Sequence, residues 1–234
     1  VFMVDHPPHA EPEQPPSIWT ATPRLIQGIP DWYPYGCPVD GPYKIPQLPL
    51  VLPTDVPRET RPFDKVASAD PRAGTMLNFY VDEKKLRRLL WNPARFASSW
   101  EGVWGISSPD FSIWDEWPPQ FRQTATWLNR AIGRVFADHG FTVVPHVRWC
   151  DRSDYDHCFA GVQYGSLVAV STHGSWRAGD LRHGFTMGLS DLKERLAPSA
   201  VILHGPINRV VRRELSGIEV VHFDADRTRR NKAA

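Results

Sequence analysis

Six short apolar runs, separated by segments of helical character, constrain the fold of this chain more than any other feature. The runs are Met76–Val81, Val103–Ser107, Thr142–Trp149, Ser166–Thr172, Ala200–Gly205 and Ile218–Phe223. Strands that alternate with helices form a mostly parallel sheet, because parallel neighbours need a crossover that a helix supplies. The sequence therefore predicts an α/β fold, in which a mostly parallel sheet, open or closed into a partial barrel, is flanked by helices.

The two clearest helices show apolar residues at helical spacing. One follows Pro118 and ends at His139 and Gly140, and the other covers about Leu181–Leu196. Proline is favoured in the first turn of a helix and glycine just after the last turn, which supports the bounds of the first. Shorter helices are expected after Asp82 and over Asn208–Leu215. Each of these helices would pack its apolar side on the sheet.

The chain divides into three parts by composition. Sixteen of the 23 prolines precede residue 75, and proline lacks the amide proton that helices and central strands use. Residues 1–70 are therefore predicted to be a Pro-rich arm, disordered at first and then packed along the domain as a strap. Residues 71–223 form the α/β domain. Residues 224–234 form a basic, disordered tail.

Composition excludes few partners. The chain has 27 Lys plus Arg against 26 Asp plus Glu, so its overall charge favours neither nucleic acid nor an acidic partner. Three cysteines are too few for a disulfide scaffold and fit a reducing compartment. The sequence also lacks an apolar stretch of about 18 residues, the minimum for a membrane span. We therefore expect a cytoplasmic protein without a membrane partner.

Polar residues follow several of the predicted strands. In parallel sheets, ligands collect at the carboxyl edge, where Asp110, Asp151, His173 and His204 would gather. Asp110 and Asp151 are candidate catalytic acids and candidate ligands of Mg²⁺, which prefers carboxylate oxygens. Each also has a structural explanation, since Asp110 follows a proline as turn residues do and Asp151 is placed to cap a helix.

Other strand ends offer candidate binding and acid–base groups. Ser171 and His173 end one strand, His204 ends the next, and Arg148 lies near the end of a third. A histidine can donate or accept a proton near neutral pH, so His173 is the candidate acid or base. Arg148, Ser171 and His204 are candidate binding groups, with ordinary strand-end turns as the alternative.

Three arginines recur at near-helical spacing between Pro118 and His139. They are Arg122, Arg130 and Arg134. Such a basic ridge could contact the phosphates of DNA or RNA, and the alternative is a solvated helix face.

Several motifs together resemble a known family. They are Ser107–Ser112 (SSPDFS), Val144–Trp149 (VPHVRW), Gly165–Ser171 (GSLVAVS) and Leu203–Gly205 (LHG). In combination they resemble a bacterial and phage domain-of-unknown-function family whose members are carried on phages, plasmids and integrated elements. The resemblance covers about residues 35–223 and implies a mobile-element setting, but no established activity. His204 stands where the family is expected to have an aromatic residue.

The resulting hypothesis is an uncharacterised phage- or plasmid-type protein that handles nucleic acid or a nucleotide. Its most specific form is a metal-assisted phosphodiester enzyme in which Asp110 and Asp151 hold Mg²⁺ and His173 is the acid or base. One alternative is a non-catalytic module of a mobile element that binds nucleic acid or protein. Another is an enzyme for a phosphorylated or carboxylated metabolite.

Overall fold

The computed structural model describes residues 25–26, 29–30, 32–54, 56–66, 73–172 and 179–224 of the 234-residue chain. The beginning of the arm, the basic tail and His173 lie outside these residues, so the predictions made for them concern parts of the chain that the structure does not describe. From β5 onward, strands and helices alternate along the chain, as the six apolar runs predict.

Seven parallel strands carry the fold in the described residues. They are β5 (Glu59–Pro62), β6 (Thr75–Asn78), β7 (Gly105–Ser107), β8 (Val143–Val144), β9 (Val168–Ser171), β10 (Ala200–His204) and β11 (Glu219–Phe223). The first four form one parallel sheet and the last three another. A parallel bridge between His146 and Ala169 links the two sheets just beyond β8. The strands therefore lie side by side in chain order, from β5 to β11.

The sheet curls so that distant strand ends meet. Neighbouring strands lie about 4.8 Å apart, so a flat sheet would separate β6 from β10 by about 19 Å. Tyr80 lies two residues beyond the end of β6, yet the centroid of its ring lies 4.4 Å from that of His204, at the end of β10. The apolar cluster that includes Met76, Val144 and Ile202 fills the inside of the curl. The partial-barrel form of the predicted fold describes this arrangement.

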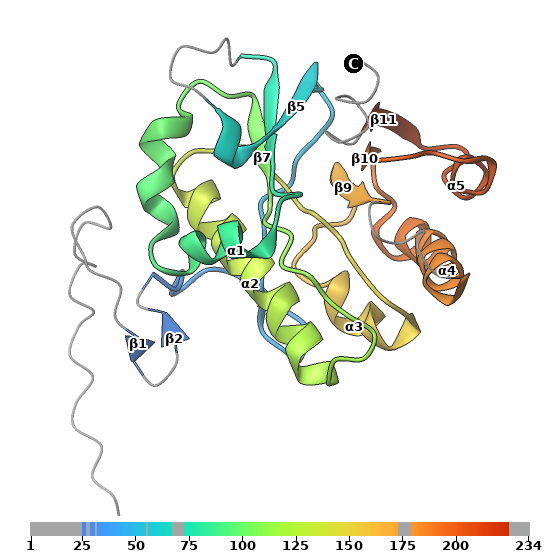
Figure 1. Ribbon diagram of the computed structural model, residues 1–234, viewed down its shortest axis with the longest axis horizontal. Coiled ribbons are helices and arrows are strands. Elements are labelled where there is room, and N and C mark those ends of the chain that lie inside the picture. The colour runs from blue at the N-terminus through green and yellow to red at the C-terminus, as the bar shows by residue number, and fades with distance from the viewer. Residues whose placement is uncertain are drawn as a thin grey trace, which may run out of the picture.

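Helices pack around the outside of the strands (Figure 1). They are α1 (Glu83–Leu86), α2 (Pro119–Asp138), α3 (Tyr155–Cys158), α4 (Gly179–Leu196) and α5 (Arg209–Glu214). Crossovers between parallel strands are right-handed, and strands added always in one direction place every crossover on the same face. None of the described helices combines the length and the apolar character that a membrane crossing requires.

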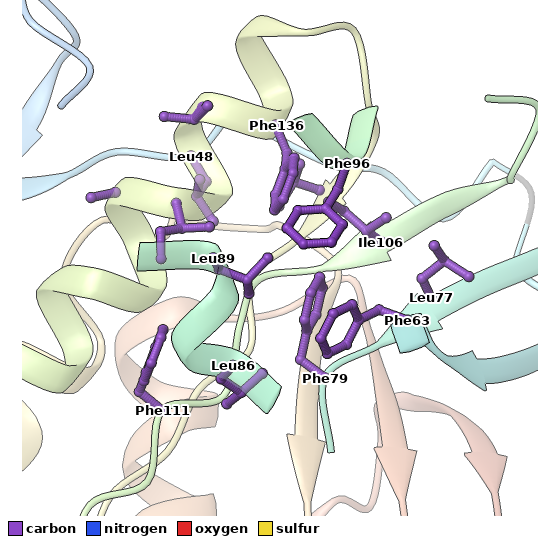
Figure 2. Close-up of a cluster of buried hydrophobic side chains, with 14 of the residues drawn as sticks. Leu48, Phe63, Leu77, Phe79, Leu86, Leu89, Phe96, Ile106, Phe111 and Phe136 are labelled. Atoms are coloured by element: carbon purple, nitrogen blue, oxygen red, sulfur yellow. The ribbon is translucent and has the colours of Figure 1, made fainter. Parts of the chain in front are cut away.

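The largest apolar cluster lies between α2 and strands β6 and β7 (Figure 2). Phe136 of α2 stacks on Phe79, which follows β6, with centroids 6.3 Å apart. The 3-10 helix η3 (Pro93–Trp100) adds Phe96 and Trp100 to the same group of rings. A second cluster packs α3, α4 and α5 against β9 and β10. These two clusters enclose the curled sheet from outside.

The arm packs along the domain, and it also supplies a strand. Its described residues form short pairs, β1 (Leu25–Ile26) with β2 (Ile29–Pro30) and β3 (Val39–Asp40) with β4 (Ile45–Pro46). Near the amino end of β9, the amide of Leu167 donates to the carbonyl of Val51 at 2.7 Å. The arm therefore covers the amino end of the barrel interior. The strand β5 also belongs to the arm, and the sequence analysis did not anticipate it.

A glycine in α4 tests the packing of the second cluster. Alanine normally stabilises a helix by about 1 kcal/mol relative to glycine, but a Cβ at Gly188 would lie 2.0 Å from Nε1 of Trp149. Trp149 cannot move freely, because it stacks on Phe185 and donates to the carbonyl of Gly184. We expect Gly188→Ala to lower the free energy of unfolding by about 1–3 kcal/mol in chemical denaturation. The exposed Ser190→Ala should change it by less than about 0.5 kcal/mol, and equal effects would contradict this packing.

Candidate functional site

The inside of the barrel changes from apolar to polar toward the carboxyl ends of its strands. Alternate residues of a strand face the same side, and paired residues of neighbouring strands face the same side. Ser107 pairs with Val144, and His146 pairs with Ala169, so both face inward with these members of the interior cluster. His204 pairs with Ser171 and with Phe223, which also belongs to that cluster.

Asn78 completes this set, because it lies two residues beyond the inward-facing Met76 of β6. All five side chains are buried. We call these five the inner polar layer: Asn78, Ser107, His146, Ser171 and His204. Ser171 and His204, two of the candidate binding groups at strand ends, are paired here on neighbouring strands.

Several polar atoms of this region are enclosed without a partner. Nδ2 of Asn78, Oγ of Ser107, Nε2 of His146 and the hydroxyl of Tyr80 are buried and make no hydrogen bond within the described part of the chain. Buried polar groups in proteins are almost always hydrogen-bonded, and leaving one unsatisfied costs about 1–3 kcal/mol. The grouping of these four atoms makes the carboxyl end of the barrel the candidate ligand site among the described residues.

Asp110 and Arg148 form an ion pair at the rim of this layer. Nη1 of Arg148 donates to both carboxylate oxygens of Asp110, at 2.9 and 2.8 Å. The carboxylate is 8% exposed and the arginine side chain 28% exposed. Burial is the largest single influence and acts to lower the pKa of Arg148, but the charge and the hydrogen bonds of Asp110, with smaller contributions from Cys150 and Tyr80, together hold that pKa above its ordinary value. Among the described residues, Nε and Nη2 of Arg148 have no hydrogen-bond partner, so this arginine keeps donors for a ligand.

The rim loop is held from α2. Asp110 lies on the loop after β7, and the next residue, Phe111, is clamped by Asn129 of α2. The amide of Phe111 donates to Oδ1 of Asn129 at 2.8 Å, and Nδ2 of Asn129 faces the carbonyl of Phe111 at 3.5 Å. This clamp fixes the carboxylate of Asp110 toward the barrel.

His146 lies between the rim and the layer. Its Nδ1 is 3.3 Å from Oδ1 of Asp110, without the alignment of a good hydrogen bond. Its amide donates to Oγ of Ser108 at 2.8 Å, and its carbonyl accepts from Nη1 of Arg130 at 2.7 Å. Burial lowers the pKa of His146 to about 4, although the Asp110 charge acts in the opposite direction. The imidazole is therefore uncharged at neutral pH.

The side chain of Tyr80 packs against the two histidines of the inner polar layer. Its ring stacks on His204 at an interplanar angle of 25° and meets the ring of His146 edge-on, 5.2 Å away. Its amide donates to Oδ1 of Asn78 at 3.3 Å. Burial, and next the charge of Asp110, raise the pKa of Tyr80 well above its ordinary value. Its hydroxyl therefore stays protonated.

The predicted basic ridge is not an exposed surface. Arg130 is 1% exposed and Arg122 is 5% exposed. Arg130 donates to the carbonyls of His146, Cys158 and Ala160, while Arg134, which is half-buried, pairs with Asp138. Helical spacing alone could not reveal this burial, because a long arginine side chain can reach backbone carbonyls of a neighbouring segment.

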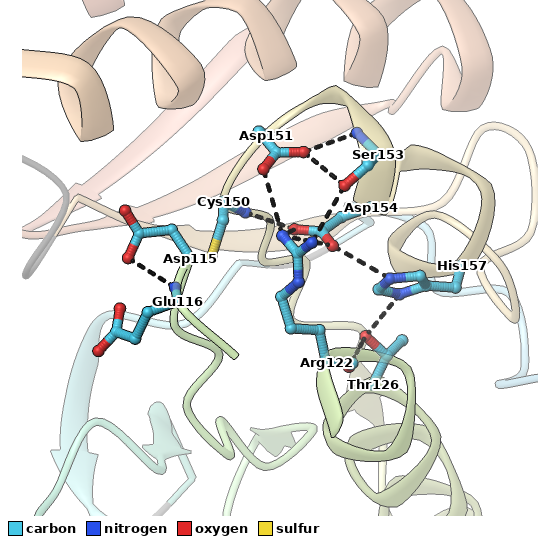
Figure 3. A network of polar contacts seen from close by, with 9 residues as sticks. All are labelled: Asp115, Glu116, Arg122, Thr126, Cys150, Asp151, Ser153, Asp154 and His157. Atoms are coloured by element: carbon cyan, nitrogen blue, oxygen red, sulfur yellow. Dashed lines mark hydrogen bonds and ion pairs between the residues drawn. The ribbon is translucent and has the colours of Figure 1, made fainter. Parts of the chain in front are cut away.

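Asp151 belongs to a separate polar network around Arg122 (Figure 3). It caps the 3-10 turn η4 (Arg152–Asp154) by accepting from the amide of Ser153 at 2.7 Å. Nη1 of Arg122 contacts Asp151 and the buried Asp154. Partial burial acts to raise the pKa of Asp151, but hydrogen bonds from Ser153 and Arg122 outweigh it and lower that pKa. The helix-cap explanation weighed above describes this geometry.

The two candidate magnesium ligands thus have different partners. Asp110 is held by Arg148 near the inner polar layer, and Asp151 by Arg122 in the network of Figure 3. Within the described ranges, no three side chains of the types His, Cys, Asp and Glu come together as a metal site would require. A metal role for Asp110 or Asp151 stays a prediction.

Sequence reasoning missed Asn78, Tyr80, Ser107 and His146 as site residues. Ser107 and His146 lie in the SSPDFS and VPHVRW motifs, but these motifs imply no established activity, and all four residue types are common in ordinary turns and strands. The available signal was the period of two: three of them occupy inward positions just beyond apolar ones on their strands. This period of two identifies the site residues only when it is known which face of each short strand lies toward the barrel interior.

Comparisons with known proteins agree with a phage relationship. The family model described as "Domain of unknown function (DUF4417)" matches residues 37–224. The "Gene 1 protein" of Mycobacterium phage L5 is 28% identical over 168 residues, covering 70% of this chain and 72% of that protein. The "Gene 1 protein" of Mycobacterium phage D29 is 28% identical over 136 residues, covering 57% of this chain and 49% of that protein. No solved structure matches significantly.

The buried imidazole predicts a pH dependence of stability. The pKa of His146 is about 4 in the folded chain against an ordinary 6.5. As the pH falls from 6.5 toward 4, the unfolded chain binds a proton there that the folded chain does not, so stability present above pH 6.5 is progressively lost. The full loss is about 3 kcal/mol.

We expect His146→Gln to flatten this part of the pH profile, measured as the free energy of unfolding between pH 7.5 and 4.5. The matched control is His222→Gln, one register away from His204 on the outer face of β11. A wild-type slope unchanged in His146→Gln would show that the imidazole is not held uncharged.

Proposed function

This chain belongs to the DUF4417 family of domains of unknown function, and we propose that it binds a nucleotide or nucleic acid at the carboxyl end of its partial barrel. The observation that carries the proposal is the inner polar layer, in which enclosed polar atoms of Asn78, Ser107 and His146 lack a hydrogen-bond partner among the described residues. In barrels of parallel strands, the carboxyl ends are where ligands bind. A ligand that hydrogen-bonds these atoms would remove the cost of leaving them unsatisfied.

Arg148 supports an anionic group on the ligand. Its side chain is partly exposed, and its Nε and Nη2 have no partner among the described residues. A guanidinium binds phosphate through paired N–H groups, which gives both affinity and orientation. The pairing of Nη1 with Asp110 fixes the direction in which the remaining donors point.

Acid–base catalysis is the reaction that needs the least rearrangement. With Asp110 beside Nδ1, the favoured tautomer of His146 carries its proton on Nδ1 and leaves the lone pair on Nε2. Nε2 could then accept a proton from a bound hydroxyl or water. In the metal-assisted phosphodiester form of the proposal, Asp110 would have to release Arg148 before both of its oxygens could face Mg²⁺.

A binding and cleavage assay tests the proposal. The purified chain is incubated with labelled single- and double-stranded DNA and RNA, with and without Mg²⁺ or Mn²⁺, and read on native and denaturing gels. We expect binding that Arg148→Ala weakens at least about tenfold, while Arg134→Ala, from the predicted ridge, leaves it unchanged.

Each outcome of the assay decides one part of the proposal. Cleavage that requires the metal and is lost in Asp110→Asn would support the metal-assisted form of the proposal. Cleavage that persists in the presence of a chelator would support the acid–base form. Equal weakening by Arg148→Ala and Arg134→Ala would indicate binding on α2. No binding of any nucleic acid or nucleotide would contradict the proposal.

A second candidate function is a non-catalytic module that binds a protein. Aromatic side chains gather beside α2, where the half-buried Tyr33 stacks on the half-buried Trp127 and meets the exposed Tyr35 edge-on. A hollow of about 280 Å³, lined by Tyr43 and Trp127 among others, adjoins them. Tyr43 and the nearby Phe121 are 42% and 60% exposed. Arg122 and Arg130 of the same helix are buried, so this face suits a protein better than phosphates.

Site-specific crosslinking tests this second function. A photoreactive phenylalanine analogue at position 121 should crosslink to a protein in cells that carry the natural phage or plasmid. The same analogue at Met187, which is 49% exposed on α4, should not. Crosslinks to nucleic acid at position 121, or equal crosslinks at both positions, would contradict a protein-binding face.

A further inference from the structure

Four of the five residues of the inner polar layer carry no charge at neutral pH. Asn78, Ser107 and Ser171 carry no ionisable group, and His146 is uncharged at neutral pH because burial lowers its pKa to about 4. The charge of Asp110 is matched by Arg148 at 2.8 Å. This balance decides which part of a nucleotide the layer can accept.

A phosphate would be disfavoured inside the layer. An anion moved out of water needs a positive partner to offset the loss of hydration. Among the described residues, the charged side chains beside the layer are Asp110, whose carboxylate is 3.3 Å from His146, and Arg148, which is paired with Asp110. Arg130 donates to three carbonyls from behind His146 and is fully buried. An uncharged, hydrogen-bonding group therefore fits the layer better than a phosphate does.

The aromatic stacking of Tyr80 on His204 narrows the class of ligand further. The ring of Tyr80 lies on His204 with centroids 4.4 Å apart and planes at 25°, so a flat six-membered ring is accommodated there. Yet the hydroxyl of Tyr80 is enclosed and makes no hydrogen bond to any described residue, although a buried tyrosine hydroxyl normally has a partner. Tyr80 follows β6 outside the strand and keeps some exposure to solvent. The ring of Tyr80 thus stacks well on His204, whereas its hydroxyl finds no hydrogen-bond partner among the described residues.

Building on the proposed function, we propose that the inner polar layer binds an uncharged nucleobase, which takes the place of Tyr80 on His204. Its polar edge then hydrogen-bonds to Asn78, Ser107 and Nε2 of His146, and the phosphate stays at the rim on Arg148. Enzymes and binding proteins that take up a base read it in this way, by stacking and by hydrogen bonds to its edge.

The proposal predicts opposite effects for the two stacking residues. His204→Ala removes the platform and should weaken nucleoside binding at least about tenfold. Tyr80→Ala removes the ring that competes with the base for His204. It should tighten nucleoside binding several-fold, because the ligand no longer has to displace that ring. Tyr80→Phe should resemble the wild type. His222→Ala and the exposed Tyr164→Ala are the matched controls, and thermal unfolding of every variant identifies any loss of the fold.

The experiment is calorimetric titration of the full chain with ribo- and deoxyribonucleosides, their 5′-monophosphates, ribose 5-phosphate and inorganic phosphate. We expect nucleosides to bind, monophosphates to bind more tightly through Arg148, and ribose 5-phosphate to bind at least about tenfold more weakly than the monophosphates. Arg148→Ala should bring the monophosphates to the affinity of the nucleosides.

Failure of this inference is distinguishable from failure of the proposed function. If ribose 5-phosphate binds as tightly as the monophosphates, or an abasic oligonucleotide as tightly as an intact one, the base contributes nothing. That result overturns the inference and leaves nucleic-acid binding in place. Weaker binding in a folded Tyr80→Ala would also overturn it. If no nucleoside, nucleotide or oligonucleotide binds, the proposed function fails as well.

Discussion

The rest of the structure depends on the junction between the two sheets, and the guanidinium of Arg130 stabilises that junction. There β8 has two residues, and one bridge, from His146 to Ala169, connects it with β9. Arg130 reaches this junction from α2 and donates to the carbonyls of His146, Cys158 and Ala160 at 2.7, 2.9 and 3.2 Å. Burial lowers its pKa to about 10, so it stays charged at neutral pH, and the three carbonyl dipoles replace its water. The same contact fixes the backbone of the histidine that faces the candidate site.

The barrel separates its apolar interior from the candidate site along its axis. The arm covers the amino end through Val51, and the apolar interior cluster lies above it. The inner polar layer at the carboxyl end costs stability, because each unpaired buried atom costs about 1–3 kcal/mol. Two large apolar clusters outside the strands offset this cost. The fold can thus tolerate a polar end that contributes little to its own stability.

The sequence supported prediction of the fold more fully than of the site. Apolar runs and helical periods sufficed for the strands from β6 to β11 and for α2 and α4, because each burial pattern is local. The strand β5 was missed because it lies among prolines, although an edge strand tolerates Pro62 at its end. Burial of Arg122 and Arg130 depends on carbonyls and carboxylates that are distant in sequence. The position of His146 beside Asp110 likewise depends on the order of β7 and β8 in the sheet.

Charge changes along the mouth of the barrel in a way that would orient a ligand. The inner polar layer holds hydroxyl and amide groups and the uncharged imidazole of His146, and the ion pair of Asp110 and Arg148 stands at its rim. A molecule with one uncharged polar end and one anionic end would lose least hydration when the uncharged end enters first. Because Arg148 is fixed by both oxygens of Asp110, the rim would hold the anionic end in one direction. The pair of Asp110 and Arg148 would therefore act as an orienting device whether or not the bound molecule reacts.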